Sequence, residues 1–365
     1  MRGYYLGSGL LMMTQTEEQP PSLDGVLSQR PDVQLMSLLA VKNDIIGHPM
    51  RKAVYNQQKL VPALLQILRS EATSMDVKVQ VVIVLGSLCH GKCSSTQFNC
   101  IPWTNLLSVG SPVTETMGVT HADIVQTLAA SLDPDMCPPQ LVIASLRSLN
   151  TFYEFNPRLT SPALSHAFYP RLTQIFQLHR KPLPKSVIIE QVALAATLLE
   201  RSCTRFELSD DFTDLDTLDA LLSFMYSFVF STWDLQRDYS FNKAPPFIYS
   251  RLLPSLLYAI GAIIKDDTER ARHVAAAKPS SPLIGSMFEE EYPMMRILLR
   301  LTKNIHGSIK LGAVECLTYM FRVGAIGNKE IGEINTLVVP ILVRLFDDTP
   351  EVRVRAPQIL GIPSH

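Results

Sequence analysis

The residues of this chain that could do chemistry are few and scattered. Its densest group of metal-ligand types is formed by Cys89, His90, Cys93 and Cys100. Structural zinc sites use two pairs of ligands at short spacing, and this stretch has neither a Cys-x2-Cys pair nor a second ligand pair at finger spacing. We therefore expect free or structural cysteines, and we predict no metal and no cofactor.

No arrangement in the sequence indicates nucleophilic catalysis or phosphate binding. The eight histidines are spread singly from His48 to His365, and none stands beside a candidate nucleophile. The segment Gly324-Ala-Ile-Gly327 lacks the spacing and the Lys-Ser/Thr of a phosphate loop, so we expect a turn there. The acidic run 289–291 precedes Pro293, where carboxylates complement a helix N-terminus. The sequence predicts a protein that is not an enzyme.

Composition narrows the class further. The chain has 365 residues, 47% of them hydrophobic and 18% charged, which is typical of a folded protein. Its 33 basic and 34 acidic residues give a net charge of -1, so we expect no nucleic-acid partner. The longest nearly apolar run, 252–264, is about 13 residues, whereas a spanning helix needs roughly 20, so we expect no membrane insertion. Six scattered cysteines favour a reducing compartment.

A pattern of eight residues recurs along the chain: apolar, proline, any, apolar, two variable positions, then two apolar residues. It occurs at 61–68, 169–176, 253–260, 292–299 and 339–346, with copies lacking proline at 125–132 and 218–225. The proline-equivalent positions lie about 64, 44, 49, 35, 39 and 47 residues apart. Without an insertion of about 22 residues in the first interval, the mean is near 43, within the roughly 40 to 47 of HEAT and armadillo units.

Each copy reads as the start of a helix. Proline suits the first turn, where its missing N–H has no intrahelical partner, and the apolar positions make one stripe on a helix. A second apolar helical segment follows most copies, at 76–88, 140–149, 187–199 and 309–320. Residues 77–85 are β-branched and could form a strand, but the repeated context favours a helix. We predict an all-α, armadillo/HEAT-type α-solenoid, a right-handed superhelix of about six to seven repeats.

The predicted organisation is a disordered leader (1–31), a solenoid (32–360) and a frayed C-terminus (361–365). Within the solenoid we expect an irregular insertion near 91–120 and a loop near 266–285, since both stretches are rich in turn formers. Residues 350–355 begin a helix that no further helix follows. This ending suggests a truncated product or an incomplete gene model, in which the last apolar stripe frays.

A partner could meet the sides of the proline-started helices that lie away from the apolar stripe. We predict a partner-binding groove lined by Gln66, Arg69, Arg171, Gln174, Tyr258, Arg300 and Arg344. An ordinary solvated helix face is the alternative at each of these positions.

Three stretches go beyond a generic repeat: 38–52, which contains Ala-Val-Lys-Asn-Asp-Ile-Ile-Gly-His, then 60–68 and 81–88. Together they resemble the N-terminal repeats of the armadillo subunit of the GID/CTLH ubiquitin ligase, especially its fungal forms. The resemblance implies a non-catalytic scaffold that links a substrate receptor to the ligase core for regulated protein degradation. It implies partners among the other ligase subunits and a cytoplasmic and nuclear location.

Two other armadillo adaptors are the alternatives. Nuclear-transport adaptors line their groove with a Trp-x3-Asn array, but here Leu107 follows Trp103 at that spacing and Arg237 follows Trp233. A catenin-like scaffold favours a strongly basic groove, which a net charge of -1 does little to support. The sequence therefore favours the ligase scaffold.

Overall fold

The computed structural model describes residues 23–48, 51–52, 54–55, 58–89, 121–155, 166–203, 215–230, 248–278, 294–304, 306–325 and 340. These residues form twelve α-helices, a few short 3-10 and π-helical segments, and no strand. The all-α prediction is confirmed, and so is the helical reading of the β-branched segment 77–85, which lies inside a helix.

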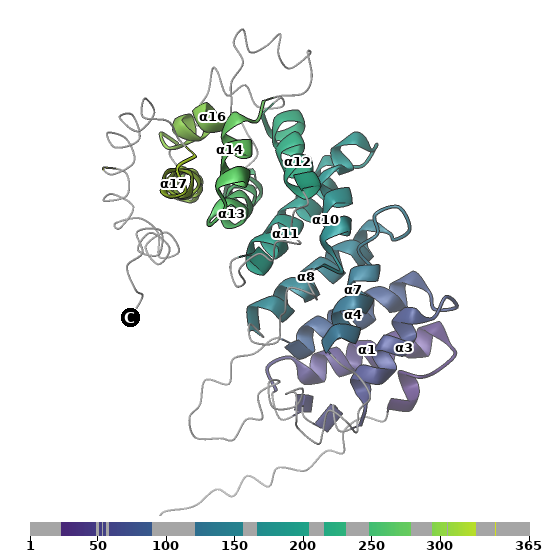
Figure 1. Ribbon diagram of the computed structural model, residues 1–365. Helices are drawn as coiled ribbons and strands as arrows, with labels where there is room; N and C mark the ends of the chain where they lie inside the picture. Colours follow the sequence, from purple (N-terminus) through teal and green to yellow (C-terminus); the bar gives the residue numbers. More distant parts are fainter. Residues whose placement is uncertain are drawn as a thin grey trace, which may run out of the picture.

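The helices stack in two rows that curve together into an arc (Figure 1). The long-helix row consists of α1 (Pro31–Ile45), α4 (Met75–Cys89), α8 (Pro139–Phe155), α11 (Lys185–Cys203), α13 (Leu253–Ile264) and α17 (Gly307–Arg322). The short-helix row consists of α3 (Leu60–Arg69), α7 (His121–Ala130), α10 (Tyr169–Phe176), α12 (Leu215–Phe224), α14 (Thr268–Ala276) and α16 (Met294–Leu301). Each long helix packs on the next, which confirms the α-solenoid.

A continuous apolar core runs between the two rows. It extends from Val26, before the first helix, to Met320 near the end of α17, and both side chains are fully buried. Burying one Leu or Phe side chain is worth about 1.5 to 3 kcal/mol, and no single helix pair can bury its own stripe. Each unit is therefore stabilised mainly by its neighbours.

Proline marks helix starts as the sequence predicts. Pro170 and Pro254 stand in the first turns of α10 and α13, Pro62 is the third residue of α3, and α16 begins directly after Pro293. The proline-started helices do not form one row, however. Helix α13 lies in the long-helix row, where it packs against α11 and α17, whereas α3, α10 and α16 lie in the short-helix row.

Two predicted boundaries are wrong where the structure describes them. The expected leader is ordered from Leu23: a 3-10 turn, η1 (Leu23–Gly25), precedes α1, and Gln34 Nε2 donates to the Val26 carbonyl at 2.9 Å. The apolar Val26 anchors this segment in the core. Part of the expected loop 266–285 is the helix α14, because the carboxylate of Asp267 accepts from the Arg270 amide at 2.8 Å and caps it.

The other expected irregular parts lie outside the described residues. They are the insertion 91–120, the rest of the loop after 278, the helix start at 350–355 and the C-terminal residues 361–365. The turn expected at Gly324 is present, with a φ of +69° that suits glycine. There the Ala325 amide donates to the Met320 carbonyl at 2.9 Å and closes the end of α17.

The long-helix row is closely packed at its crossings. A Cβ on Gly86 of α4 would lie 2.5 Å from the Ser148 hydroxyl of α8, and one on Gly312 of α17 would lie 2.8 Å from Leu257 Cβ of α13. Hydrogen bonds from side chains to backbone run across the same crossings. Ser148 Oγ donates to the Val82 carbonyl at 2.8 Å, and Cys316 Sγ donates to the Leu257 carbonyl at 3.2 Å. This row forms the spine of the solenoid.

Candidate partner-binding surfaces

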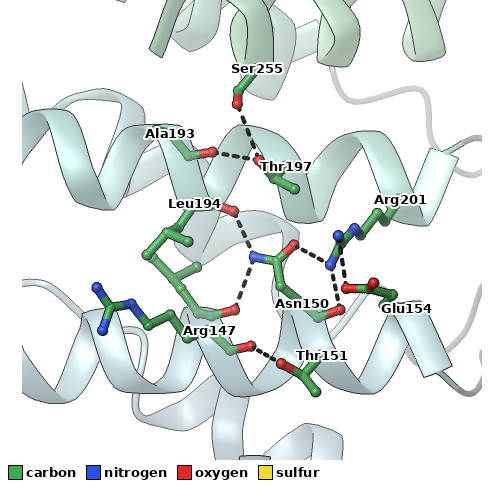
Figure 2. A network of polar contacts seen from close by, with 10 residues as sticks. Arg147, Asn150, Thr151, Glu154, Ala193, Leu194, Thr197, Arg201 and Ser255 are labelled. Carbon is green, nitrogen blue, oxygen red and sulfur yellow. Dashed lines mark hydrogen bonds and ion pairs between the residues drawn. The ribbon is translucent and has the colours of Figure 1, made fainter. Parts of the chain in front are cut away.

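A polar stripe runs across α8, α11 and α13 of the long-helix row (Figure 2). Arg147, Thr151 and Glu154 lie along α8, three to four residues apart, so they share one helix face. Glu190, Thr197 and Arg201 lie seven and four residues apart along α11, so they too share one helix face. These side chains are exposed or half-buried, whereas most of the residues between them are buried.

Asn150 ties the middle of this stripe together. Its side chain is only 6% exposed, and its Nδ2 donates to the Leu146 carbonyl at 3.0 Å and across the row to the Leu194 carbonyl at 2.9 Å. Arg201 of α11 donates to the Asn150 carbonyl at 2.7 Å and forms an ion pair with Glu154 at 3.1 Å. A buried amide that is satisfied on both sides fixes the register of α8 against α11.

The remaining polar groups of the stripe also pair between units. Arg147 forms an ion pair with Glu190, and the hydroxyls of Thr197 and Ser255 lie 3.2 Å apart. The result is a hydrogen-bonded, charge-balanced surface without an activated nucleophile or a nucleophile–base pair.

The short-helix row is linked mainly by ion pairs. Arg69 of α3 lies 3.5 Å from the Asp123 carboxylate of α7 and donates to the Thr127 hydroxyl. Arg171 of α10 pairs with Asp133, which follows α7, at 2.8 Å. Lys181 pairs with Asp135 in the same region. These cations hold neighbouring units together.

A hollow of about 660 Å³ opens on this row between α10, α12 and α14, and we call it the α12 hollow. Its walls include a 3-10 turn, η2 (Leu178–Arg180), and a π-helical turn, η3 (Met225–Phe230). The lining residues are Thr173, Gln177, Arg180, Asp216, Asp219, Ala220, Leu222, Ser223, Tyr226, His273, Ala277 and Lys278. Polar side chains from three successive helices therefore face one space.

The residues predicted to line a groove fall on both rows. Gln66 is exposed on α3, Arg69 pairs with α7, and Arg171 and Gln174 are joined by a 3.1 Å hydrogen bond. Tyr258, in the long-helix row, donates to the Ser308 carbonyl at 3.1 Å.

Arg300 is half-buried on α16, and Arg344 lies outside the described residues. The structure thus brings Arg171 and Gln174 together, but it does not gather the predicted set on one surface. Their role in partner binding remains a prediction. On α8 the exposed members of the stripe, Arg147, Thr151 and Glu154, recur every three to four positions and so carry a sequence signal, whereas the buried Asn150 does not.

The titratable groups argue against activated chemistry in the described part. Burial raises the pKa of the Cys89 and Cys203 thiols to about 12, so both remain protonated at neutral pH. Burial lowers the pKa of His179 below its ordinary value. No group of three or more metal-ligand side chains lies among the described residues. None of the described helices is both long enough and apolar enough to cross a membrane.

Comparison with known proteins finds one relative by sequence and two crystal structures of similar fold. No protein-family model matches the chain. GID complex subunit 5 of Schizosaccharomyces pombe is 22% identical over 353 residues, which cover 90% of this chain and 42% of the relative. The chain thus spans less than half the length of that relative.

Two crystal structures of engineered proteins share the fold. One has a TM-score of 0.56 at 14% identity and covers 93% of this chain and 66% of its own. The other has a TM-score of 0.52 at 12% identity and covers 82% of this chain and 95% of its own. At these identities the likeness concerns the fold alone.

Proposed function

We propose that this chain is a non-catalytic scaffold of a GID/CTLH-type ubiquitin ligase, which connects a substrate receptor with the ligase core. The observation that carries the proposal is the similarity to GID complex subunit 5, which runs through 90% of the chain instead of one motif. The stretch 38–48, which contains the Lys-Asn and Ile-Ile-Gly-His residues, adds to it.

The described structure supports a scaffold in two ways. A one-dimensional stack presents a long surface for its size, which suits a protein that must hold several others at once. Several of its polar side chains join neighbouring units, as Asn150 does across α8 and α11 and as the Arg171–Asp133 pair does in the short-helix row. The raised pKa of the buried Cys203 thiol does not favour its nucleophilic, ionised form. A location in the cytoplasm and nucleus is part of the same proposal.

The test is affinity purification of the tagged chain from its own cells, followed by mass spectrometry. Recovery of other GID/CTLH subunits in amounts comparable to the bait supports the proposal. Recovery of importins or catenins in their place, or of no GID/CTLH subunit at all, overturns it.

Two glycine variants test whether binding of the ligase subunits depends on the close packing of the long-helix row. In Gly312→Val the added side chain meets Leu257 Cβ at 2.8 Å, so the α13–α17 crossing must open. In Gly261→Ala the nearest atom, Glu315 Cγ, lies 3.5 Å from the new Cβ, an ordinary contact. At equal protein levels, we expect Gly261→Ala to retain the ligase subunits and Gly312→Val to lose part of them.

A further inference from the structure

The α12 hollow has walls of different charge. The α12 wall carries Asp216 and Asp219, the α14 wall carries His273 and Lys278, and the wall from α10 and η2 carries Gln177 and Arg180. The two basic side chains, Arg180 and Lys278, match the two acidic ones, Asp216 and Asp219, in number. The hollow as a whole therefore does not attract a polyanion, and any selectivity must come from individual side chains.

Most polar groups on the α12 and α14 side are already satisfied. His273 Nε2 lies 2.5 Å from the Asp219 carboxylate, and the buried Tyr226 hydroxyl donates to the Ala277 carbonyl at 2.7 Å. The hydroxyls of Thr173 and Thr217 lie 2.7 Å apart and join α10 to α12. These contacts set the width of the hollow and leave this side little capacity for new hydrogen bonds.

The wall from α10 and η2 is different. Arg180 is exposed, and within the described part of the chain its guanidinium makes no hydrogen bond or ion pair. The same holds there for the side-chain amide of Gln177, three residues earlier. Arg69 and Arg171, in the same row, each meet a carboxylate of a neighbouring unit. Arg180 lines the hollow, but it meets no such carboxylate among the described residues.

We propose that the α12 hollow is a docking site for an extended segment of a partner protein that presents a single Asp or Glu carboxylate to Arg180. The planar guanidinium donates two parallel hydrogen bonds to a carboxylate, and Gln177 and Ser223 offer further polar groups for the segment's backbone. About 660 Å³ lies within the usual range of binding clefts, roughly 300 to 1,000 Å³.

The carboxylates of Asp216 and Asp219 favour a ligand with one negative charge over a ligand with several. Asp216 and Asp219 stand on the adjacent wall and repel a second and third negative charge close to the first. A single carboxylate on a peptide fits this setting, whereas a phosphate chain or nucleic acid does not. The inference rests on the proposed function only in that the occupant is a protein.

The experiment places the photo-crosslinking residue p-benzoylphenylalanine at Gln177 in the full-length tagged chain and irradiates the cells. Mass spectrometry then identifies the peptide joined to position 177. The same residue at Arg272, which is exposed on α14 but does not line the hollow, is the control for random collision. Two further variants carry p-benzoylphenylalanine at position 177 together with Arg180→Glu or with Arg180→Lys.

We expect an adduct at 177, absent at 272, with a peptide that has Asp or Glu within about three residues of the crosslink. Arg180→Glu should reduce its yield about tenfold or more, because a charge pair is replaced by repulsion, and Arg180→Lys should retain part of it. A synthetic copy of that peptide should bind wild type in fluorescence anisotropy and lose binding when its acidic residue becomes Lys.

Three results overturn the inference: no adduct above the level at 272, an adduct unchanged by Arg180→Glu, or an adduct with nucleic acid or a peptide without acidic residues. The outcome is separable from the proposed function. If Arg180→Glu leaves the adduct yield unchanged and ligase subunits still co-purify with the chain, the docking site is refuted and the scaffold role stands. If the acidic peptide belongs to a protein outside any ligase and no ligase subunit co-purifies, the reverse holds.

Discussion

Gly86 of α4 should be a glycine because α8 leaves it no room for a side chain. In Gly86→Ala, the new Cβ lies 2.5 Å from Ser148 Oγ, 3.2 Å from Ser148 Cβ and 3.3 Å from Ser148 Cα. Replacing glycine within a helix by alanine normally gains about 0.5 to 1 kcal/mol. Overpacking normally costs about 1 to 3 kcal/mol, and here one of the atoms met is backbone. The clash should win, and we expect a net loss of about 1 to 2 kcal/mol.

A double-mutant cycle isolates the contact. Ser148→Ala alone removes one buried hydrogen bond to the Val82 carbonyl, a loss of about 1 kcal/mol. In the double variant the hydroxyl that meets the new Cβ is gone, so the two losses should not add. We expect a coupling of about 1 kcal/mol or more, whereas independent sites add within about 0.3 to 0.5 kcal/mol.

The assay is urea unfolding followed by circular dichroism, with hydrogen exchange of the α4 and α8 amides because a repeat array can open unit by unit. Gly261→Ala is the control, since its Cβ meets nothing nearer than 3.5 Å, and it should stabilise by about 0.5 to 1 kcal/mol. If Gly86→Ala is as stable as wild type, or the cycle is additive, the close crossing of α4 and α8 is refuted.

Further predictions concern charge and thiols. Arg171→Ala should lower the melting temperature more than Arg30→Ala, because Asp133 is 14% exposed and the Arg30–Asp32 pair is solvated, where such pairs contribute at most about 1 kcal/mol; equal shifts would contradict this. Cys89 and Cys203 should resist iodoacetamide at pH 8 until urea unfolds the chain, as read by mass spectrometry. Their pKa values are raised from 9.0 to about 12, so both favour the folded state below pH 9. That stability is lost between pH 9 and 12, where only the unfolded thiols ionise, and thermal melts across this range check it.

Much of the fold could be predicted because its signals are local. Pro170 and Pro254 mark helix starts by their own backbone geometry, and the apolar stripes of α8 and α11 follow from a period of 3.6 residues. The row to which a helix belongs is not a local property. Helix α13 has the same proline pattern as α10, yet it stacks between α11 and α17, which only the three-dimensional packing decides.

The site residues show the same division. The helix pattern places Arg69 and Arg171 away from the buried stripe, but it does not tell whether such a cation meets a partner or a neighbouring unit. Asn150 was missed because an asparagine in an apolar helix has no distinctive spacing; its importance comes from the Leu194 carbonyl, 44 residues away. Helix α14 was missed because its charged sequence resembles a loop until Asp267 is recognised as a cap.

The crossings of the long-helix row have a consequence for evolution. At several of them a side chain donates to a main-chain carbonyl, as with Ser148 and Val82, Asn150 and Leu194, Cys316 and Leu257, and Tyr258 and Ser308. Every amino acid supplies a carbonyl, so only the donor's identity is constrained and the accepting position is free to drift. A frame joined in this way can keep its shape while many of its residues change.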